Sequence, residues 1–446
     1  MALTGLEIYK QLPKKNCGEC GTPTCLAFAM NLAAGKASLD ACPYVTPEAR
    51  EALESASAPP IAKIILGTGE KAVEMGDETE LFRHDKRFYH EPVIAIQLSD
   101  ALPEEEILSR VKAINELVFE RVGQRYTVEA IALIHEAEDQ SAFARAVNAV
   151  ANNSALNLVL MAEDPEVLRP ALPAVASRRP LLYAAQASNY EAMVALAKEY
   201  NCPLVVKGSD LNELADLVDK IAASGYRQLV LDPGARQVSR AVADFTQIRR
   251  LAIKKRFRSF GYPIMAVTTA SDPLMEVLEA VNYICKYASL VVLKTADRAH
   301  LLPLLSWRQN LYTDPQVPIR VEEKIYEIGE VNENSPVYVT TNFSLTYYSV
   351  EGEVEASKVP SYIIAVDTNG LSVLTAYADG KFEAEKIAGV MKKLGIENKV
   401  KHRTLVIPGT VAVLKGKLED LTGWKVLVGP REASGIPAFA RSHFAA

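Results

Sequence analysis

The chain has 446 residues, 23% of them charged and 49% hydrophobic, and its formal net charge is −6. This length exceeds the roughly 50–250 residues of a single domain, so we expect two or three domains. An acidic chain without a basic run argues against a nucleic-acid-binding protein. No apolar run reaches the roughly 18 residues of a membrane helix, and the first residues lack a signal-peptide core. We therefore expect a cytoplasmic protein that is not inserted in a membrane.

The first predicted element is a cysteine module. Four of the six cysteines lie near the start of the chain, at Cys17, Cys20, Cys25 and Cys42. In a reducing compartment, clustered cysteines bind metal more often than they form disulfides. Three ligands within nine residues and a distant fourth favour a [4Fe–4S] cluster. Structural zinc, which often uses two separate C-x2-C pairs, is the alternative.

Two glycines support the cluster interpretation. Gly18 and Gly21 each directly follow a cysteine, and their freedom to adopt positive φ lets backbone N–H groups turn toward the sulfur atoms. The stretch after Cys25 is predicted to be helical and to end near Gly35. Residues 54–60 are small and polar and end in two prolines, which predicts a linker after a cysteine domain of residues 1–57.

A regular alternation of apolar runs and helical patterns follows the linker. The runs suit buried strands and cover residues 92–98, 129–134, 156–161, 180–185, 203–206, 228–231, 263–267 and 290–293. Continuous apolar strands that alternate with helices indicate a parallel sheet. Eight such units in about 220 residues fit a closed (β/α)8 TIM barrel better than a large open sheet. We expect this barrel to span residues 58–320, with a hairpin within 62–79 and a first helix over 104–119.

The pattern changes after the barrel. Four apolar runs, at 335–341, 361–368, 403–410 and 425–430, are separated by helical stretches. They predict a smaller open α/β domain of the Rossmann or flavodoxin type, residues 321–446. Small or polar residues follow each of these strands, and ligands of open α/β sheets bind outside the carboxyl ends of the strands.

The barrel offers weaker candidates for a site. Asp232 begins a DPGA turn at the end of the sixth barrel strand, where barrel enzymes keep their active sites. It is either an ordinary Asp-Pro-Gly turn or an aspartate that binds a pterin ring. Other polar residues at strand ends are Asp100, Glu163, Asp164, Lys207, Asp210, Thr268 and Lys294. No histidine lies in the D-x-H-x-x-G string of a domain that ligates cobalamin through histidine.

The string NCGECGTPTCLAFA…CP, the eight-unit barrel and the C-terminal α/β domain together resemble the large (gamma) subunits of the corrinoid iron–sulfur protein family. That family serves the reductive acetyl-CoA pathway of anaerobes. The resemblance implies a methyl carrier, and not a stand-alone enzyme. A methyl group passes from methyltetrahydrofolate to Co(I) of a protein-bound cobamide and then to the nickel–iron–sulfur site of acetyl-CoA synthase. The [4Fe–4S] cluster reductively reactivates Co(II).

The resemblance also implies partners and contacts. The partners are the small subunit in a heterodimer, a methyltetrahydrofolate methyltransferase, acetyl-CoA synthase/CO dehydrogenase, and a reductive activator or ferredoxin. The cobamide is expected base-off and without a histidine ligand, because an axial ligand would make Co(I) harder to reach. The corrinoid contacts that we expect are Thr340, Thr346, Gly370, Leu371, Ser372, Val373 and Ala433, with Pro408, Gly409, Thr410 and Gly429 as second choices. The alternatives are a pterin-dependent methyltransferase barrel with its own redox cluster, and a ferredoxin-like electron adaptor.

Overall fold

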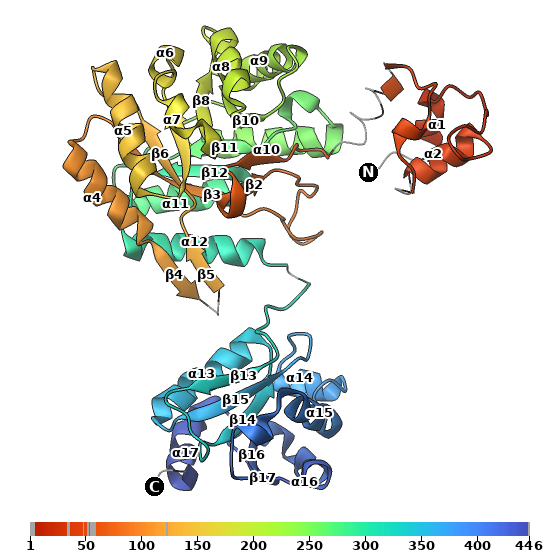
Figure 1. Cartoon of the computed structure of the whole chain (residues 1–446), viewed down its shortest axis with the longest axis vertical. Helices are drawn as coiled ribbons and strands as arrows, with labels where there is room; N and C mark the ends of the chain where they lie inside the picture. The colour runs from red at the N-terminus through yellow and green to blue at the C-terminus, as the bar shows by residue number, and fades with distance from the viewer. Residues whose placement is uncertain are drawn as a thin grey trace. The chain divides into compact units, whose positions relative to one another are not determined.

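The computed structural model describes residues 5–33, 36–47, 49–50, 53, 59–121, 124–314 and 316–444. The chain divides into two compact units, one of residues 1–81, 89–113 and 129–295, and one of residues 82–88, 114–128 and 296–446 (Figure 1). The domain boundaries after residues 57 and 320 remain our proposal. Residues 54–58 of the predicted linker and Gly35 lie outside the described residues. None of the described helices is both long and apolar enough to cross a bilayer.

The cysteine module is built on two short helices, α1 (Gly5–Gln11) and α2 (Cys25–Ala33), followed by the 3-10 turn η1 (Leu39–Ala41). The two helices pack closely, since a Cβ atom placed on Gly5 would lie 2.1 Å from Sδ of Met30. Their shared core contains Ile8, Phe28 and Ala29, together with the side chains of Cys25 and Cys42. Two of the four clustered cysteines, Cys25 and Cys42, thus belong to the packed interior of this small module.

A closed barrel of eight parallel strands forms the centre of the first unit. The strands are β3 (Val93–Ser99), β6 (Ala130–Ile134), β7 (Asn157–Met161), β8 (Leu181–Ala185), β9 (Leu204–Lys207), β10 (Leu229–Asp232), β11 (Ile264–Val267) and β12 (Ala288–Leu293). The ring closes where β12 pairs with β3, at Leu290 opposite Val93. The TIM barrel and all eight predicted strands are confirmed.

Helices follow the barrel strands in the chain. They are α4 (Glu104–Asn115), α5 (Gln140–Asn153), α6 (Pro165–Leu168), α7 (Leu172–Val175), α8 (Tyr190–Tyr200), α9 (Leu211–Ala223), α10 (Val238–Lys255), α11 (Pro273–Cys285) and α12 (Arg298–Tyr312). The barrel interior is filled by side chains such as Val159, Tyr183 and Met265, so it is a packed core and not a pore.

Two antiparallel hairpins accompany the barrel. The predicted hairpin is confirmed as β1 (Ile64–Leu66) paired with β2 (Val73–Met75). The helix predicted over 104–119 is too long, because α4 ends at Asn115 and a second hairpin follows, β4 (Val118–Arg121) with β5 (Gln124–Thr127). Valine, phenylalanine, tyrosine and threonine in that stretch favour a strand over a helix, and this preference was stronger than the apparent helical period.

The C-terminal domain has a five-stranded sheet in the order β13-β15-β14-β16-β17. The strands are β13 (Ile325–Ile328), β14 (Val337–Thr341), β15 (Ser361–Val366), β16 (Thr404–Ile407) and β17 (Lys425–Val428). The last four were predicted and are parallel, whereas β13 was missed and pairs with β15 in the antiparallel direction. The four parallel strands follow the flavodoxin-like order 2-1-3-4, whose direction reverses between β14 and β16.

Helices cover both faces of this sheet (Figure 1). They are α13 (Ser344–Ser357), α14 (Val373–Ala378), α15 (Ala384–Leu394), α16 (Lys415–Thr422) and α17 (Ile436–Phe444). Alternate residues of β14 enter different cores, because successive side chains of a strand point to opposite faces. Val337 and Val339 belong to the core that also contains Phe382 and Trp424, whereas Tyr338 belongs to the core with Tyr347.

The chain enters the C-terminal domain along the carboxyl end of its sheet. In this entering segment, residues 318–321, Val321 N donates to Asn342 O at 2.9 Å, and Ile319 O accepts from Ser344 N at 3.0 Å. Gly370, with φ +74°, lies so close that an added Cβ would be 2.9 Å from Cβ of Pro318. The entering segment is therefore fixed to the loops that follow β14 and β15.

Candidate functional site

The four cysteines of the module differ in how far they are exposed. Cys17 is exposed, Cys20 is half-buried, and Cys25 and Cys42 are buried. Cys25 is the first residue of α2; its N–H donates to Oδ1 of Asn16 at 2.8 Å, and Asn16 N points to Sγ of Cys25 at 3.4 Å. A backbone N–H that points at sulfur stabilises negative charge on a thiolate. The module thus supplies the kind of donor that a cysteine-ligated cluster needs.

The two glycines of the module adopt the predicted conformation. Gly18 and Gly21 both have φ +78°, and Gly21 N donates to Gly18 O at 3.0 Å. A structural zinc ion would need four donors about 2.0–2.3 Å from a single point. In the part of the chain that the structure describes, no three His, Cys, Asp or Glu side chains gather closely enough to hold one ion. A [4Fe–4S] cluster spreads its four cysteines over four iron atoms, and the spacing of the cysteines remains the observation that favours it over zinc.

A cavity of about 500 Å³ lies at the carboxyl end of the C-terminal sheet. Its walls come from β14, from α13, and from the loops after β15, β16 and β17, as shown by Thr340, Thr346, Ser372, Thr410 and Gly429. This is the point where the strand order reverses between β14 and β16, and open α/β sheets bind their ligands at that point. The volume falls within the roughly 300–1,000 Å³ of small-molecule sites.

Backbone atoms approach closely in one wall of the cavity. Gly409 N donates to Pro430 O at 3.0 Å, and Gly429 N donates to Ile407 O at 2.9 Å. A Cβ placed on Gly409 would lie 2.5 Å from the carbonyl oxygen of Gly429. Only glycine fits there, so the loops after β16 and β17 can lie side by side and shape the cavity.

Two hydroxyl groups beside this cavity lack partners. Among the described residues, Tyr338 Oη and Thr340 Oγ1 are buried and make no hydrogen bond, and both residues line the cavity. Burial raises the pKa of Tyr338 to about 12, so its hydroxyl stays protonated and able to donate. A buried polar group without a partner costs about 1–3 kcal/mol, so these hydroxyls fit a cavity whose occupant brings hydrogen-bonding groups.

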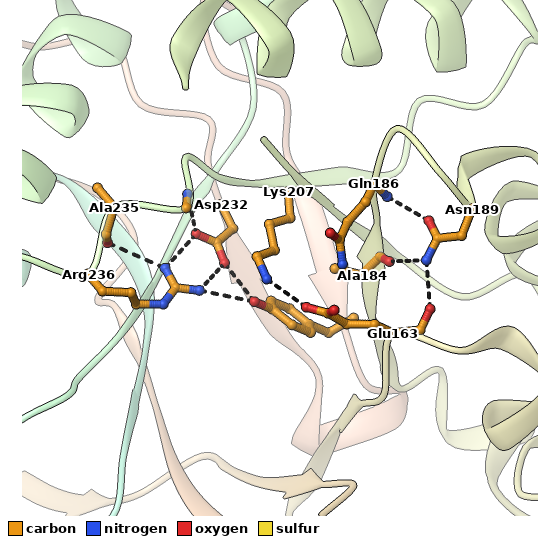
Figure 2. A network of polar contacts seen from close by, with 10 residues as sticks. Glu163, Ala184, Gln186, Asn189, Lys207, Asp232, Ala235 and Arg236 are labelled. Atoms are coloured by element: carbon orange, nitrogen blue, oxygen red, sulfur yellow. Dashed lines mark hydrogen bonds and ion pairs between the residues drawn. The ribbon is translucent and has the colours of Figure 1, made fainter. Parts of the chain in front are cut away.

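The mouth of the barrel holds a network of charged groups (Figure 2). Asp232, at the end of β10, is fully buried. Its Oδ2 accepts from Tyr183 Oη at 2.9 Å and from Arg236 Nη2 at 2.7 Å, and its Oδ1 accepts from Arg236 Nη1 at 2.9 Å and from Gly234 N at 2.8 Å. Beside it, Lys207 Nζ donates to Glu163 Oε1 at 2.6 Å.

The electrostatics of this network follow from burial and pairing. Burial and the negative charge of Asp232 raise the pKa of the Tyr183 hydroxyl. Burial opposes the charge of Arg236, but Asp232 outweighs it and raises the pKa of the guanidinium. Burial also acts against the charge of Glu163, yet the hydrogen bond from Lys207 lowers its pKa. Each charge in the network therefore has its counter-charge within the protein.

The pterin interpretation of Asp232 needs a carboxylate that is free to bind a ring. Four donors already occupy both of its oxygens, which is the full capacity of a carboxylate. A pterin would have to displace the partly exposed Arg236 from its ion pair with the buried Asp232. The geometry favours the other interpretation, in which Asp232 orders its own turn and holds Tyr183 and Arg236 in place.

The remaining polar residues at the strand ends also have structural partners. Asp164 and Asp210 cap the N-termini of α6 and α9. Asp100 accepts from His135 Nδ1 at 2.7 Å and from two backbone amides. Thr268 Oγ1 donates to Glu276 Oε1 at 2.6 Å, and this glutamate oxygen also accepts from Lys294 N at 2.7 Å. None of these contacts brings an acid and a base together around an open space.

Comparison with known proteins places the chain in a family. A family model described as CO dehydrogenase/acetyl-CoA synthase delta subunit matches residues 63–440, and a second, described as a candidate Fe–S cluster, matches residues 12–44. The corrinoid/iron-sulfur protein large subunit of Moorella thermoacetica is 75% identical over 445 residues, which is 100% of both chains. The chain belongs to the family of corrinoid/iron–sulfur protein large subunits. The resemblance seen in the sequence is confirmed.

More distant matches agree with the family. The acetyl-CoA decarbonylase/synthase complex subunit gamma of Methanothermobacter thermautotrophicus is 38% identical, and the alignment covers 98% of each chain. Among solved structures, a truncated 3-deoxy-D-arabino-heptulosonate 7-phosphate synthase of Thermotoga maritima has a TM-score of 0.37 and 15% identity, and the match covers 55% of this chain and 89% of that chain. A likeness at that level carries no argument about function.

In this large-subunit chain, the residues expected to contact a corrinoid fall into two groups. Five line the cavity: Thr340, Thr346, Ser372, Val373 and Ala433. Gly370 and Leu371 do not line it. Gly370 makes the turn against the entering segment, and Leu371 packs on the core beneath it. Of the second choices, Pro408, Thr410 and Gly429 line the cavity and Gly409 stands behind its wall.

Several cavity residues of the large-subunit chain were missed by the sequence analysis. They are Tyr338, Val339, Leu345, Ser349, Val350, Leu374, Val406, Ile407, Pro430, Arg431 and Ile436. The spacing of Leu345, Ser349 and Val350 is that of one face of a helix, and would have revealed the contribution of α13. Nothing in the sequence pattern marks Tyr338, because a tyrosine in a buried strand is ordinary core composition.

Proposed function

We propose that the chain is a methyl-carrier subunit that binds a cobamide in its C-terminal domain and a [4Fe–4S] cluster in its cysteine module. The observation that carries this proposal is the cavity of about 500 Å³ at the reversal point of the C-terminal sheet. It lies in a chain that matches a corrinoid/iron-sulfur protein large subunit over its whole length. The cytoplasm, where thiols stay reduced, is the compartment that we propose for it.

The residues present fit a cobamide. None of the described residues that line the cavity is a histidine, so the lining offers no imidazole to cobalt. This supports base-off binding without a histidine ligand. Tyr338 and Thr340 offer unpartnered hydroxyls, and Arg431 offers a positive charge to the phosphate of the nucleotide tail. The close approach at Gly409 keeps the wall flat for a large ring.

The bound cobamide would take a methyl group onto Co(I) from methyltetrahydrofolate, by way of a separate methyltransferase, and deliver it to the nickel–iron–sulfur site of acetyl-CoA synthase. The role of this chain is to hold and present the cofactor. Thr340 and Ser372 at the strand ends orient the cofactor by hydrogen bonds, and the apolar side chains of Leu345 and Leu374 at the rim exclude water. Leu345 and Leu374 are 64% and 56% exposed, as expected for a rim that a large ring or a partner covers.

The cysteine module would hold the [4Fe–4S] cluster that returns Co(II) to the Co(I) state. Cys17, Cys20 and Cys25 supply three thiolates from one loop and the start of α2, and Cys42 supplies the fourth. The partners that we propose are a small subunit in a heterodimer, a methyltetrahydrofolate methyltransferase, acetyl-CoA synthase/CO dehydrogenase, and a reductive activator or ferredoxin.

Metal analysis of the anaerobically purified protein tests the proposal. The wild-type chain with its small partner should contain about four iron atoms and one cobalt atom per heterodimer. Cys42→Ser should lose iron and keep cobalt. Cys202→Ser is the matched control and should keep both metals, because Cys202 is buried beside the Tyr226 hydroxyl in the barrel unit. Zinc in place of iron, or a complex without cobalt, would overturn the proposal.

A second measurement separates the carrier from the alternative enzyme. A methyl carrier alone should be inert toward methyltetrahydrofolate and should become methylated only when the methyltransferase is added. A pterin-dependent methyltransferase would consume methyltetrahydrofolate by itself. Turnover by the isolated chain that Asp232→Asn abolishes would favour the alternative.

A further inference from the structure

Three residues join the two segments that carry the cluster ligands. Tyr44 Oη donates to Glu19 Oε1 at 2.7 Å, and Lys15 Nζ lies 3.8 Å from the centre of the Tyr44 ring. Lys15 precedes Cys17 by two residues, and Glu19 lies between Cys17 and Cys20. Tyr44 follows Cys42 by two residues and therefore lies after α2 in the chain, whereas Lys15 and Glu19 lie before it.

These contacts matter because Cys42 is the one ligand that the local loop does not place. Cys17, Cys20 and Cys25 lie within nine residues, whereas sixteen residues separate Cys25 from Cys42. Closing that longer segment costs entropy, and contacts between its two ends add to the core packing of Cys42 in offsetting this cost. In the described part of the module, the contacts of Tyr44 with Lys15 and Glu19 link the ligand loop directly to the residues after Cys42.

The chemistry of each contact is suited to this role. Tyr44 Oη donates and the carboxylate of Glu19 accepts, so this hydrogen bond is made to a charged group and is stronger than one between neutral groups. Lys15 brings a positive charge to the ring face, where a cation is attracted by the π electrons.

We propose that Lys15, Glu19 and Tyr44 form a clamp that positions Cys42 against the ligand loop and places one positive charge beside the cluster. The inference rests on the proposed cluster and adds positioning residues to it. The clamp has two consequences that can be measured apart. The hydrogen bond from Tyr44 to Glu19 slows the loss of iron, and the positive charge of Lys15 favours the reduced cluster, which carries one more electron than the oxidised form.

The module contains a matched control. Lys14 Nζ lies 5.6 Å from the ring of Tyr9, so this second pair has the same composition, but Tyr9 belongs to α1 and does not follow a ligand. Lys14→Gln removes the same net charge as Lys15→Gln. Tyr9→Phe removes the same hydroxyl as Tyr44→Phe. Any difference between the two pairs reports position and not composition.

The experiment uses the anaerobic full chain with its cluster. Tyr44→Phe should release iron to a chelator roughly 3- to 10-fold faster than wild type, because one hydrogen bond is lost. Lys15→Gln should lower the midpoint potential of the cluster, so that at a fixed potential the ratio of reduced to oxidised cluster falls by roughly two- to fivefold. Tyr9→Phe and Lys14→Gln should change these quantities by less than half as much.

The outcomes separate this inference from the function. If the wild-type chain holds no iron, the proposed cluster fails. If wild type holds its cluster and Tyr44→Phe and Lys15→Gln match it, or match the Tyr9 and Lys14 variants, the clamp is wrong and the cluster stands. Tyr44→Leu removes the aromatic ring as well as the hydroxyl, whereas Tyr44→Phe removes the hydroxyl alone. If the clamp is correct, the Tyr44→Leu protein releases iron faster than the Tyr44→Phe protein, and the midpoint potential of its cluster is lower than that of wild type.

Discussion

Adding one methyl group to Gly409 tests whether backbone contact shapes the cavity of the C-terminal domain. An added Cβ would meet three backbone atoms, at 2.5 Å from Gly429 O, 2.8 Å from Pro430 C and 2.9 Å from Arg431 N. Because none of these can rotate away, the two loops must separate by roughly 0.9 Å to restore ordinary contact. Gly409→Ala should therefore destabilise the C-terminal domain by about 1–3 kcal/mol, the usual cost of overpacking.

The control is a glycine with open space around it. Gly352 is exposed within α13, and nothing lies within 4 Å of a Cβ placed there. Gly352→Ala should stabilise the domain by about 0.5–1 kcal/mol, because alanine loses less backbone entropy in a helix. The two substitutions add the same atom and should have opposite signs.

Fluorescence in urea provides the assay. The chain has two tryptophans, and Trp424 is buried in the C-terminal core. In a Trp307→Phe background, its emission reports the unfolding of that domain alone, and each midpoint gives a change in free energy. If Gly409→Ala is as stable as its parent, the two loops do not need their close approach, and the description of this cavity wall is wrong.

Three further predictions concern other polar groups. Thr340→Val keeps the shape of threonine and removes an unpartnered hydroxyl. The cofactor-free domain should be at least as stable in urea, and cobamide binding should weaken by roughly 3- to 10-fold. If binding of cobinamide, which lacks the nucleotide tail, weakens equally, the Thr340 hydroxyl does not contact the tail. Asp232→Asn should destabilise the barrel by about 1–3 kcal/mol in denaturant, because an amide replaces a buried carboxylate that accepts four hydrogen bonds, two of them from the partly exposed Arg236. A loss below about 0.5 kcal/mol would mean that the pair is not needed. Although burial acts the other way, hydrogen bonds from Asn369 N and Asn342 Nδ2 hold the pKa of Asp367 below its ordinary 3.8. The ionised carboxylate therefore stabilises the fold fully above that pH, and this stabilisation is lost as the pH falls below it. In a plot of the urea midpoint against pH, Asp367→Asn should reduce the fall of the midpoint at acid pH. If that fall is unchanged, this carboxylate is not its cause.

The parallel strands could be predicted because burial on both faces leaves uninterrupted apolar runs. Val230 and Leu231 in β10, or Ile363 and Ile364 in β15, are examples. The edge strand β13 was missed for the complementary reason. Its residues are only half-buried and include Glu327, so the run resembles an exposed loop until its pairing with β15 is known.

The candidate site was predicted in part. Small and polar residues at the ends of parallel strands are visible in the sequence, and together with the family resemblance they led to the prediction of Thr340 and Ser372. The cavity also depends on Leu345 and Val350 from α13 and on Tyr338, whose position on the cavity side is set by strand register. Register and helix rotation arise from packing, which the sequence pattern does not specify at single-residue accuracy.

For Asp232, the sequence predicted the position of the residue but not the contacts of its side chain. Its place at the end of a barrel strand pointed to both a turn and a ligand site, and the two interpretations differ only in what its oxygens contact. Arg236, four residues further along the chain, decides the matter by occupying both of them. A sequence shows that an arginine is near, but not that its side chain turns inward.

The hydrogen bonds that attach residues 318–321 to the loops after β14 and β15 have a mechanical consequence. If the cofactor domain reorients to meet successive partners, these residues must travel with it, and the pivot has to lie earlier in the chain than Pro318. Tension on this segment would then reach the loops after β14 and β15 through Asn342, Ser344 and Gly370, so that reorientation and the shape of the neighbouring cavity would be coupled.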